Sequence, residues 1–273
     1  MEQEWKTTVW GVRGSMPAAS EDFLQYGGNT SCISVNCGGF LVVFDAGSGL
    51  IQLGKWLKDS CIKRVNLFFS HIHIDHVIGL YAFQALHDPE MEIHLYGEAR
   101  EGVSFRHQLE TLIGPPYWPL GLEDFRARIE VCEIRPEQFI SLTKEIVVRT
   151  MRGSHPNGSL YFRLEDARRS MVYALDCELE KAFVPKIVQF ARDTNLLVCD
   201  ANFTEEDLLH CRGWGHSSWQ QCLDLRKACG AKLALLTHYS NDYDDCFLRE
   251  QERLAILVDQ AARFAREGME VLI

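Results

Sequence analysis

The segment Ser70-His71-Ile72-His73-Ile74-Asp75-His76 lies between two apolar runs and carries three histidines and an aspartate. Side chains along a strand alternate between its two sides, so His71 and His73 lie on the same side of an extended chain. Asp75 and His76 follow where the chain turns into a predicted helix, and their side chains can reach a second point nearby. Isolated histidines are usually surface or core residues. Four metal-competent side chains at the end of a buried strand instead predict a metal centre.

Three more candidate ligands stand at the ends of predicted strands. His155 follows the apolar stretch 146–151, Asp176 ends the stretch 171–175, and His238 follows 233–236. Taken singly, His155 is typical of a surface histidine and Asp176 of a helix cap. Their repetition at successive strand ends indicates one common site.

This HxHxDH, His, Asp, His order resembles the metallo-β-lactamase superfamily. The resemblance implies an α/β fold, a four-layer αββα sandwich of two mixed β-sheets, and we expect residues 1–273 to form a single domain of this kind. It also implies two metal ions, the first held by His71, His73 and His155, the second by Asp75, His76 and His238, with Asp176 bridging them. Asp45, at the end of the strand 40–44, would support the metal-binding loop. Cys177 is expected to point away from its neighbour Asp176 and is not a predicted ligand.

Imidazole and carboxylate ligands suit zinc, and manganese or iron are compatible with the same set. Two divalent ions a few ångströms apart share a water and lower its pKa. We therefore expect hydrolysis by attack of a metal-bridging hydroxide, with Asp75 as an essential catalytic residue.

A second constellation narrows the reaction. Gly215-His216-Ser217-Ser218 precedes a predicted helix, and Cys199-Asp200-Ala201-Asn202 ends a buried strand. One interpretation is a serine-capped helix beside an exposed histidine. The other comes from resemblance to the phosphodiesterase branch of the superfamily, which includes ribonuclease Z. It implies that His216 binds phosphate or protonates the leaving oxygen, while Asp200 holds its tautomer.

Four further segments resemble bacterial hydrolases of this fold that are described as cyclic-nucleotide phosphodiesterase-like: 10–15, 26–32, 115–119 and 238–245. No ribonuclease Z-type protruding arm is evident between the histidine segment and His155, and together with the acidic balance this favours a small phosphodiester, such as a cyclic nucleotide, as substrate. The alternatives are a ribonuclease Z-like nuclease, a thioester, lactone or β-lactam hydrolase, and a noncatalytic metal-binding sensor.

Composition limits the partners. The chain has 28 basic and 38 acidic residues, a formal charge of −10 and no basic run, which argues against long nucleic acid. No signal peptide or bilayer-spanning run is visible, and ten cysteines without CxxC spacing predict reduced thiols. We therefore expect a cytoplasmic protein without a membrane partner, compatible with a homodimer.

Several predicted elements bear on the site. The loop Gly114–Leu120, with three prolines and two aromatic residues, either walls the active site or covers the core. We expect a helix to continue over 82–87 and another, interrupted or kinked at Pro185, over 179–191. A long helix over 247–266 followed by a strand at 270–273 would close the domain.

Overall fold

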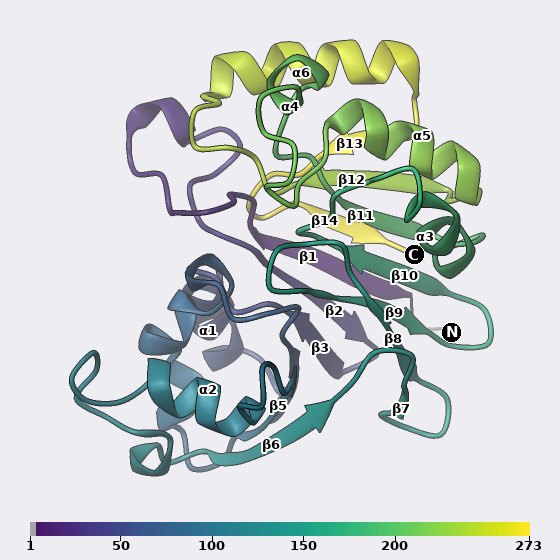
Figure 1. Ribbon diagram of the computed structural model, residues 1–273. Helices are drawn as coiled ribbons and strands as arrows, with labels where there is room; N and C mark the ends of the chain where they lie inside the picture. Colours follow the sequence, from purple (N-terminus) through teal and green to yellow (C-terminus); the bar gives the residue numbers. More distant parts are fainter. Residues whose placement is uncertain (1–3) are drawn as a thin grey trace. The chain divides into compact units, whose positions relative to one another are not determined.

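The computed structural model describes residues 4–273, which separate into two compact units. The first unit contains the chain up to Gly11 together with 29–135 and 268–272. The second contains 12–28, 136–267 and Ile273. Each unit is built around one sheet (Figure 1). The expectation of a single domain over 1–273 stays a prediction.

The first unit contains a seven-stranded mixed sheet in the order β14-β1-β2-β3-β4-β5-β6. Pairing is antiparallel from β14 to β3 and parallel from β3 to β6. Its strands are β1 (Trp5–Gly11), β2 (Cys32–Cys37), β3 (Phe40–Phe44), β4 (Arg64–Phe68), β5 (Glu92–Glu98), β6 (Arg128–Ile134) and β14 (Glu270–Leu272).

The glycine pair between β2 and β3 makes the predicted two-residue hairpin. Cys37 pairs with Phe40, and the φ angles of Gly38 and Gly39 are 71° and 93°. Two successive positive φ angles match the right-handed twist of the flanking strands and favour glycine. The turn therefore sets the register of β3, whose end carries Asp45.

Two helices, α1 (Leu50–Lys58) and α2 (Phe105–Leu112), bury apolar side chains in the core of the first unit. The predicted helix after the histidine segment is wrong, because three 3₁₀ segments occur instead: Ile74–His76, Ile78–Ala82 and Gln84–His87. The Gly79 amide donates to Ala46 O at 2.8 Å, and His76 O accepts from the Ala46 amide at 2.8 Å. These bonds take backbone groups that a continuous α-helix needs for its own i→i−4 ladder.

The proline-rich loop covers the core of the first unit. Trp118 and Leu120 pack against that core, and the Trp118 ring lies 5.0 Å from the Tyr81 ring, centroid to centroid. Tyr117 is exposed. Of the two alternatives left open by the sequence, the packing supports the core-covering one.

The second unit contains another seven-stranded mixed sheet, in the order β13-β12-β11-β10-β9-β8-β7. Pairing is parallel from β13 to β10 and antiparallel from β10 to β7. Its strands are β7 (Phe139–Ser141), β8 (Val147–Arg152), β9 (Leu160–Glu165), β10 (Ser170–Ala174), β11 (Leu196–Asp200), β12 (Leu233–Thr237) and β13 (Ala262–Phe264). The edge strand β7 was not predicted.

The helices of the second unit are α3 (Val184–Phe190), α4 (Glu205–Leu208), α5 (Trp219–Cys229) and α6 (Asp245–Val258). Helix α5 packs on β11 and β12, and α6 packs on β13 (Figure 1). The Ser218 side chain caps α5 in a capping box with Gln221, as the serine-cap interpretation expected.

Two helix predictions in this unit are wrong. Pro185 lies in the first turn of α3 instead of kinking a longer helix, because its missing N–H costs nothing there. The predicted helix over 247–266 ends at Val258, and 262–264 forms β13 instead. Ala262 and Phe264 are buried while the residue between them is exposed, which is the two-residue period of a strand.

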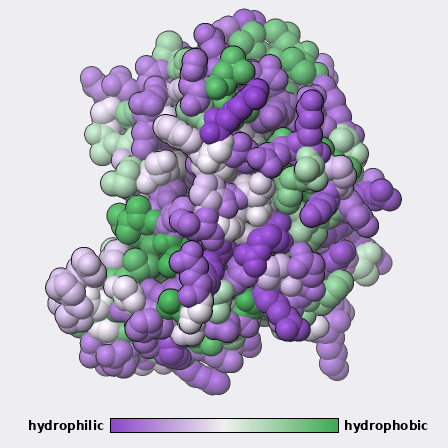
Figure 2. All heavy atoms as spheres, viewed as in Figure 1, coloured by the Kyte–Doolittle hydropathy of each residue, from purple (hydrophilic) through white to green (hydrophobic). Residues whose placement is uncertain are grey.

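The outer face shown in Figure 2 is mostly hydrophilic, with hydrophobic side chains in separate groups. None of the helices within residues 4–273 combines the length and the apolar composition needed to cross a bilayer.

A buried arginine fixes the segment that follows β12. Arg13 Nε donates to Gly27 O at 2.8 Å, and its Nη1 donates to Tyr243 O at 2.7 Å and Ser240 O at 3.2 Å. Its guanidinium carbon lies 4.7 Å from the centroid of the Phe23 ring. One side chain thus satisfies three backbone carbonyls and holds the 12–28 segment against 240–243.

We expect Arg13→Ala to lower the free energy of unfolding by about 3 kcal/mol or more, since several buried carbonyls lose their donor. Arg13→Lys should recover only part of the loss, because an ammonium cannot reproduce the planar fork. Urea denaturation measures both. Arg253→Ala, which removes an exposed ion pair with Glu250, is the control and should leave the free energy of unfolding nearly unchanged. Equal losses for Arg13→Ala and Arg253→Ala would contradict this account.

Candidate functional site

In the first unit, the histidine segment follows β4 and leaves the sheet at its carboxyl end. The ring centroid of His71 lies 4.3 Å from that of His73 and 4.4 Å from that of His76. Asp75 Oδ2 lies 3.2 Å from His76 Nε2. The structure therefore gathers the four predicted donors of this segment into one group.

Asp45 orients that group from the end of β3. Its Oδ2 lies 2.7 Å from His76 Nδ1 and accepts a hydrogen bond from Ser70 Oγ at 2.8 Å, while its Oδ1 accepts from the Ser70 amide at 2.7 Å. Because a carboxylate only accepts, the proton of neutral His76 is on Nδ1. The Ser70 hydroxyl, having donated to Asp45, can accept from His71 Nδ1 at 3.0 Å. The Nε2 atoms of both rings are left with a lone pair.

In the second unit, the candidate donors stand where strands end. Asp176 comes two residues after β10, Asp200 ends β11, and His238 directly follows β12. Asp176 and His238 adopt positive φ angles of 51° and 67°. Left-handed backbone is uncommon for non-glycine residues, though Asp and His are among those that tolerate it. This backbone conformation directs the side chains of Asp176 and His238 away from the two faces of the sheet to which strand side chains alternately point.

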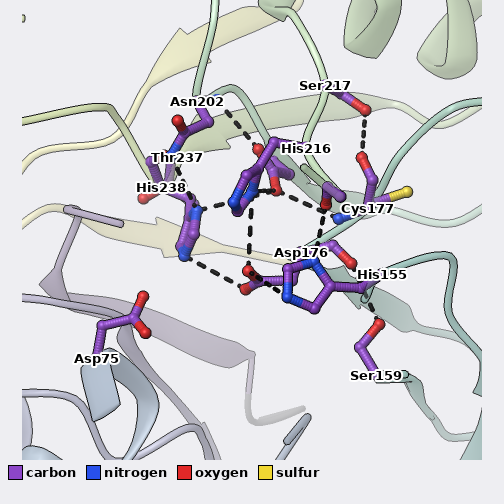
Figure 3. Close-up of polar contacts among 12 residues, drawn as sticks. Asp75, His155, Ser159, Asp176, Cys177, Asn202, His216, Ser217, Thr237 and His238 are labelled. Carbon is purple, nitrogen blue, oxygen red and sulfur yellow. Dashed lines mark hydrogen bonds and ion pairs between the residues drawn. The ribbon is translucent and has the colours of Figure 1, made fainter. Parts of the chain in front are cut away.

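Asp176 lies between two imidazoles (Figure 3). Its Oδ1 is 3.6 Å from His155 Nε2, and its Oδ2 is 3.3 Å from His238 Nε2. Each carboxylate oxygen thus has a different histidine as neighbour. A carboxylate that bridges two cations, each with its own imidazole ligand, requires this arrangement.

His216 and Asp200 form the contact predicted for them. His216 Nδ1 lies 2.8 Å from Asp200 Oδ2, which also accepts from the Cys177 amide at 3.2 Å, and Asp200 Oδ1 accepts from the Asn202 amide at 3.0 Å. Asp200 is buried, and the ligand atoms of Asp176, Asp200, His216 and His238 all lie within 4.8 Å of one another. Asp200 thus holds Nδ1 of His216 and fixes the orientation of the ring.

His155 is held by the backbone of the loop that carries His216. Its Nδ1 donates to Gly215 O at 3.0 Å, which leaves Nε2 with a lone pair in the neutral ring. Burial lowers the pKa of His155 below its ordinary value of 6.5, while Asp176 opposes the shift. A neutral imidazole is the form that binds metal.

Sequence reasoning missed three residues that shape this group. Asn202 Nδ2 donates to His238 O at 2.8 Å. Glu178 accepts from the amides of Gly213 at 2.8 Å and Gly215 at 3.1 Å, so it clamps the loop before His216. Gly14 lies so close to His238 that an added Cβ would be 2.7 Å from its ring. Gly14 lies in the segment 10–15 and Asn202 in the segment 199–202, but the sequence assigned neither of them a role at this site, and Glu178 was not singled out.

Cys177 is not part of either donor group. It is buried, burial raises the pKa of its thiol well above the ordinary value, and its carbonyl accepts from Ser217 Oγ. A thiol that resists ionisation is a poor ligand.

The donor chemistry of both units fits divalent metal ions. His71, His76 and His155 have their Nδ1 atoms occupied by a hydroxyl, a carboxylate and a carbonyl, so each neutral ring carries its lone pair on Nε2. Metal-ligating histidines are usually oriented in this way, through a hydrogen bond from the other ring nitrogen.

Comparison with known proteins identifies the family. The family model described as the beta-lactamase superfamily domain matches residues 41–239. The chain is 25% identical over 285 residues to the ribonuclease Z of Archaeoglobus fulgidus, covering 88% of each chain.

Two solved structures are similar in fold. The metallo-β-lactamase fold protein YhfI from Bacillus subtilis has a TM-score of 0.75 at 21% identity, with 99% of each chain covered. The short form of human tRNase Z has a TM-score of 0.71 at 20% identity, with 97% of this chain and 98% of that chain covered.

The chain therefore belongs to the beta-lactamase superfamily, in the metallo-β-lactamase-fold branch related to ribonuclease Z. The predicted α/β sandwich with two mixed sheets and the prediction of a metal-dependent hydrolase are confirmed. The argument against long nucleic acid from net charge does not fit the ribonuclease Z relatives. Net charge describes the field of the whole surface and does not describe a local site. The cytoplasmic location and the homodimer stay predictions.

We expect Gly215→Ala to weaken metal retention by about 10-fold or more, the usual effect of disturbing a ligand's supporting partner. The new Cβ would lie 2.2 Å from His155 Nδ1, so the ring must move. Gly213→Ala is the matched control, because its φ of +84° resembles the +87° of Gly215 and nothing lies within 4 Å of its Cβ. Competition with a chromophoric chelator measures both affinities. Identical affinities would show that Gly215 does not position His155.

Proposed function

We propose that the chain is a phosphodiester hydrolase whose two donor groups serve one dimetal centre. His71, His73 and His155 would hold one ion, Asp75, His76 and His238 the other, and Asp176 would bridge them. Support comes from the family, from the oriented histidines in each unit, and from Asp176 having a different imidazole beside each of its oxygens. Zinc is the metal we propose, since nitrogen and carboxylate donors suit it.

The observation that carries the phosphodiester assignment is the His216–Asp200 pair beside Asp176. Asp200 Oδ2 accepts a hydrogen bond from His216 Nδ1 and stabilises the protonated ring. The ring can then present a protonated Nε2 to a phosphate oxygen or to the leaving oxygen. His216 is partly exposed and lines a pocket of the second unit with a volume of about 410 Å³. Hydrolysis of a lactone or thioester would need no such acid next to the metal ligands.

Bound divalent ions would lower the pKa of a water and offset negative charge on the phosphate. The protein's own residues do the rest. Asp45, Gly215 and Asn202 orient the ligands, and Asp200 stabilises His216 in its doubly protonated form through Nδ1. The protonated ring would give its Nε2 proton to the leaving oxygen as the ester bond breaks and return to the neutral form with its proton on Nδ1.

Two substrate classes fit this chemistry. A small phosphodiester, such as a cyclic nucleotide, is supported by the resemblance of the segments 10–15, 26–32, 115–119 and 238–245 to cyclic-nucleotide phosphodiesterase-like hydrolases. The 3′ region of an RNA is supported at least equally by the ribonuclease Z relatives, which cover 88% of the chain in the case of Archaeoglobus fulgidus. Both require the same water attack and the same acid.

We expect Asp75→Ala to abolish turnover of every substrate, because it removes a proposed ligand. His216→Ala should lower kcat on bis(p-nitrophenyl) phosphate by roughly 10²- to 10⁴-fold, the usual contribution of a general acid, and affect a lactone much less. Metal analysis and steady-state kinetics on both substrates are the measurements.

His107→Ala is the control for these variants, since His107 is an exposed histidine on α2. It should retain wild-type kinetics. Wild-type phosphodiester turnover by His216→Ala would refute the acid role. Turnover of the lactone alone would favour an acyl hydrolase, and metal binding without any turnover would favour a sensor.

Salt dependence separates the two substrate classes. With a cyclic nucleotide, we expect kcat/KM to change by no more than about 3-fold between 50 and 200 mM salt, because few charges are neutralised on binding. A transfer-RNA precursor bound through many phosphates would lose roughly 10³-fold or more over the same range. Cleavage of the precursor at its 3′ side, with that steep loss and no cyclic-nucleotide turnover, would assign the RNA reaction.

A further inference from the structure

We propose that the pocket beside His216 binds the nucleobase of the substrate and prefers bases that carry an exocyclic amino group. The inference rests on the proposed function, because the base would be attached to the phosphodiester that His216 contacts. The pocket lies within the second unit, and its volume of about 410 Å³ is in the range of small-ligand sites.

Aromatic side chains form one wall of the pocket next to His216. The Phe203 ring lies 5.9 Å from the His216 ring and 6.3 Å from the Trp214 ring, centroid to centroid, with edge-on geometry in both pairs. Phe203 is buried, whereas Trp214 is 61% exposed. A ligand with its phosphate at His216 therefore meets an indole that still has most of its surface to bury.

The exposed indole is held on a fixed loop. Glu178 accepts hydrogen bonds from the amides of Gly213 and Gly215, the residues on either side of Trp214. Gly215 in turn accepts from His155. A large apolar side chain anchored in this way, and left in solvent, is typical of a surface that stacks a planar ligand.

Two carboxylates, Asp207 and Asp242, are among the polar groups that line the pocket. Thr204 Oγ1 donates to Asp207 Oδ2 at 2.7 Å, and Tyr243 Oη donates to the same oxygen. These hydrogen bonds, with Thr204 first, lower the pKa of Asp207 and keep it ionised. Within residues 4–273, Asp207 Oδ1 has no hydrogen-bond partner, and the exposed Asp242 adds a second carboxylate to the lining.

The two carboxylates disfavour a second phosphate in the pocket and favour a planar ligand with N–H donors. No lysine or arginine of the described chain lines the pocket, so a second phosphate would be repelled. A flat heterocycle with N–H donors would stack on Trp214 and donate to a carboxylate. Adenine, guanine and cytosine have an exocyclic amino group for this, whereas hypoxanthine and uracil have a carbonyl oxygen instead.

Trp214→Ala tests the stacking. We expect KM for 2′,3′-cyclic AMP to rise by about 10-fold, within the range that base stacking contributes, and by several-fold less for the base-free methyl p-nitrophenyl phosphate. Leu209→Ala is the control, because Leu209 is 62% exposed close by in the sequence and does not line the pocket. It should leave both substrates unchanged. Equal losses on the two substrates for Trp214→Ala would overturn the proposal.

The amino preference is tested with a matched pair of bases. Wild type should bind 2′,3′-cyclic AMP at least about 5-fold better than 2′,3′-cyclic IMP, and Asp242→Asn should narrow the difference. Equal KM values for the two bases in wild type would refute the preference. An RNA that ends in adenosine is assayed alongside 2′,3′-cyclic AMP. The substrate whose KM rises more in Trp214→Ala is the one whose base occupies the pocket.

Binding without turnover separates this inference from the proposed function. Adenosine should quench tryptophan fluorescence of the wild type saturably, and Trp214→Phe should remove most of that quenching. Adenosine binding together with no hydrolysis of any phosphodiester would refute the proposed function and leave the pocket assigned. Phosphodiester hydrolysis without adenosine binding would refute the nucleobase pocket and leave the proposed function supported.

Discussion

The chemistry of this chain depends on hydrogen bonds that hold one nitrogen of each imidazole and leave the other with a lone pair. Asp45 fixes His76 directly and His71 through Ser70, and Gly215 O fixes His155. A histidine with a free choice of tautomer would present either nitrogen, and part of the population would have a proton where a cation must bind. Asp200 likewise holds Nδ1 of His216, and its carboxylate stabilises the protonated ring that the proposed acid role requires.

Backbone strain at the strand ends makes these contacts possible. Asp45, Asp176 and His238 all adopt left-handed φ angles directly after or near the ends of β3, β10 and β12. Each such residue costs on the order of 1 kcal/mol, and the surrounding hydrogen bonds must offset it. A regular strand would send alternate side chains to opposite faces of the sheet. The left-handed residue instead aims its donor along the edge, where the donors of neighbouring strands converge.

The family and the fold leave the substrate open, because one fold supports many reactions. In the function we propose, donors at strand ends form the hydrolytic centre, and the residues beside it decide what is hydrolysed. In the second unit the wall next to His216 combines Phe203, Trp214 and Asp207, a surface suited to a planar donor and unsuited to another phosphate. The acidic net charge of the chain describes its whole surface, so it bears on diffusion toward polyanions more than on this local choice.

The sequence alone determined those features that rest on short spacing. The histidine segment, the Gly38-Gly39 hairpin, the Ser218 cap and the position of donors after apolar strands all depend on neighbours within a few residues. Tertiary structure decided whatever depends on partners distant in the chain. The backbone bonds between Ala46 and the 76–79 segment replaced a predicted helix with 3₁₀ turns, and pairing with β12 ended α6 early and made 262–264 a strand. The sequence did not reveal the roles of Glu178 and Asn202, because these roles exist only where the folded chain brings a loop amide or a carbonyl within hydrogen-bonding distance.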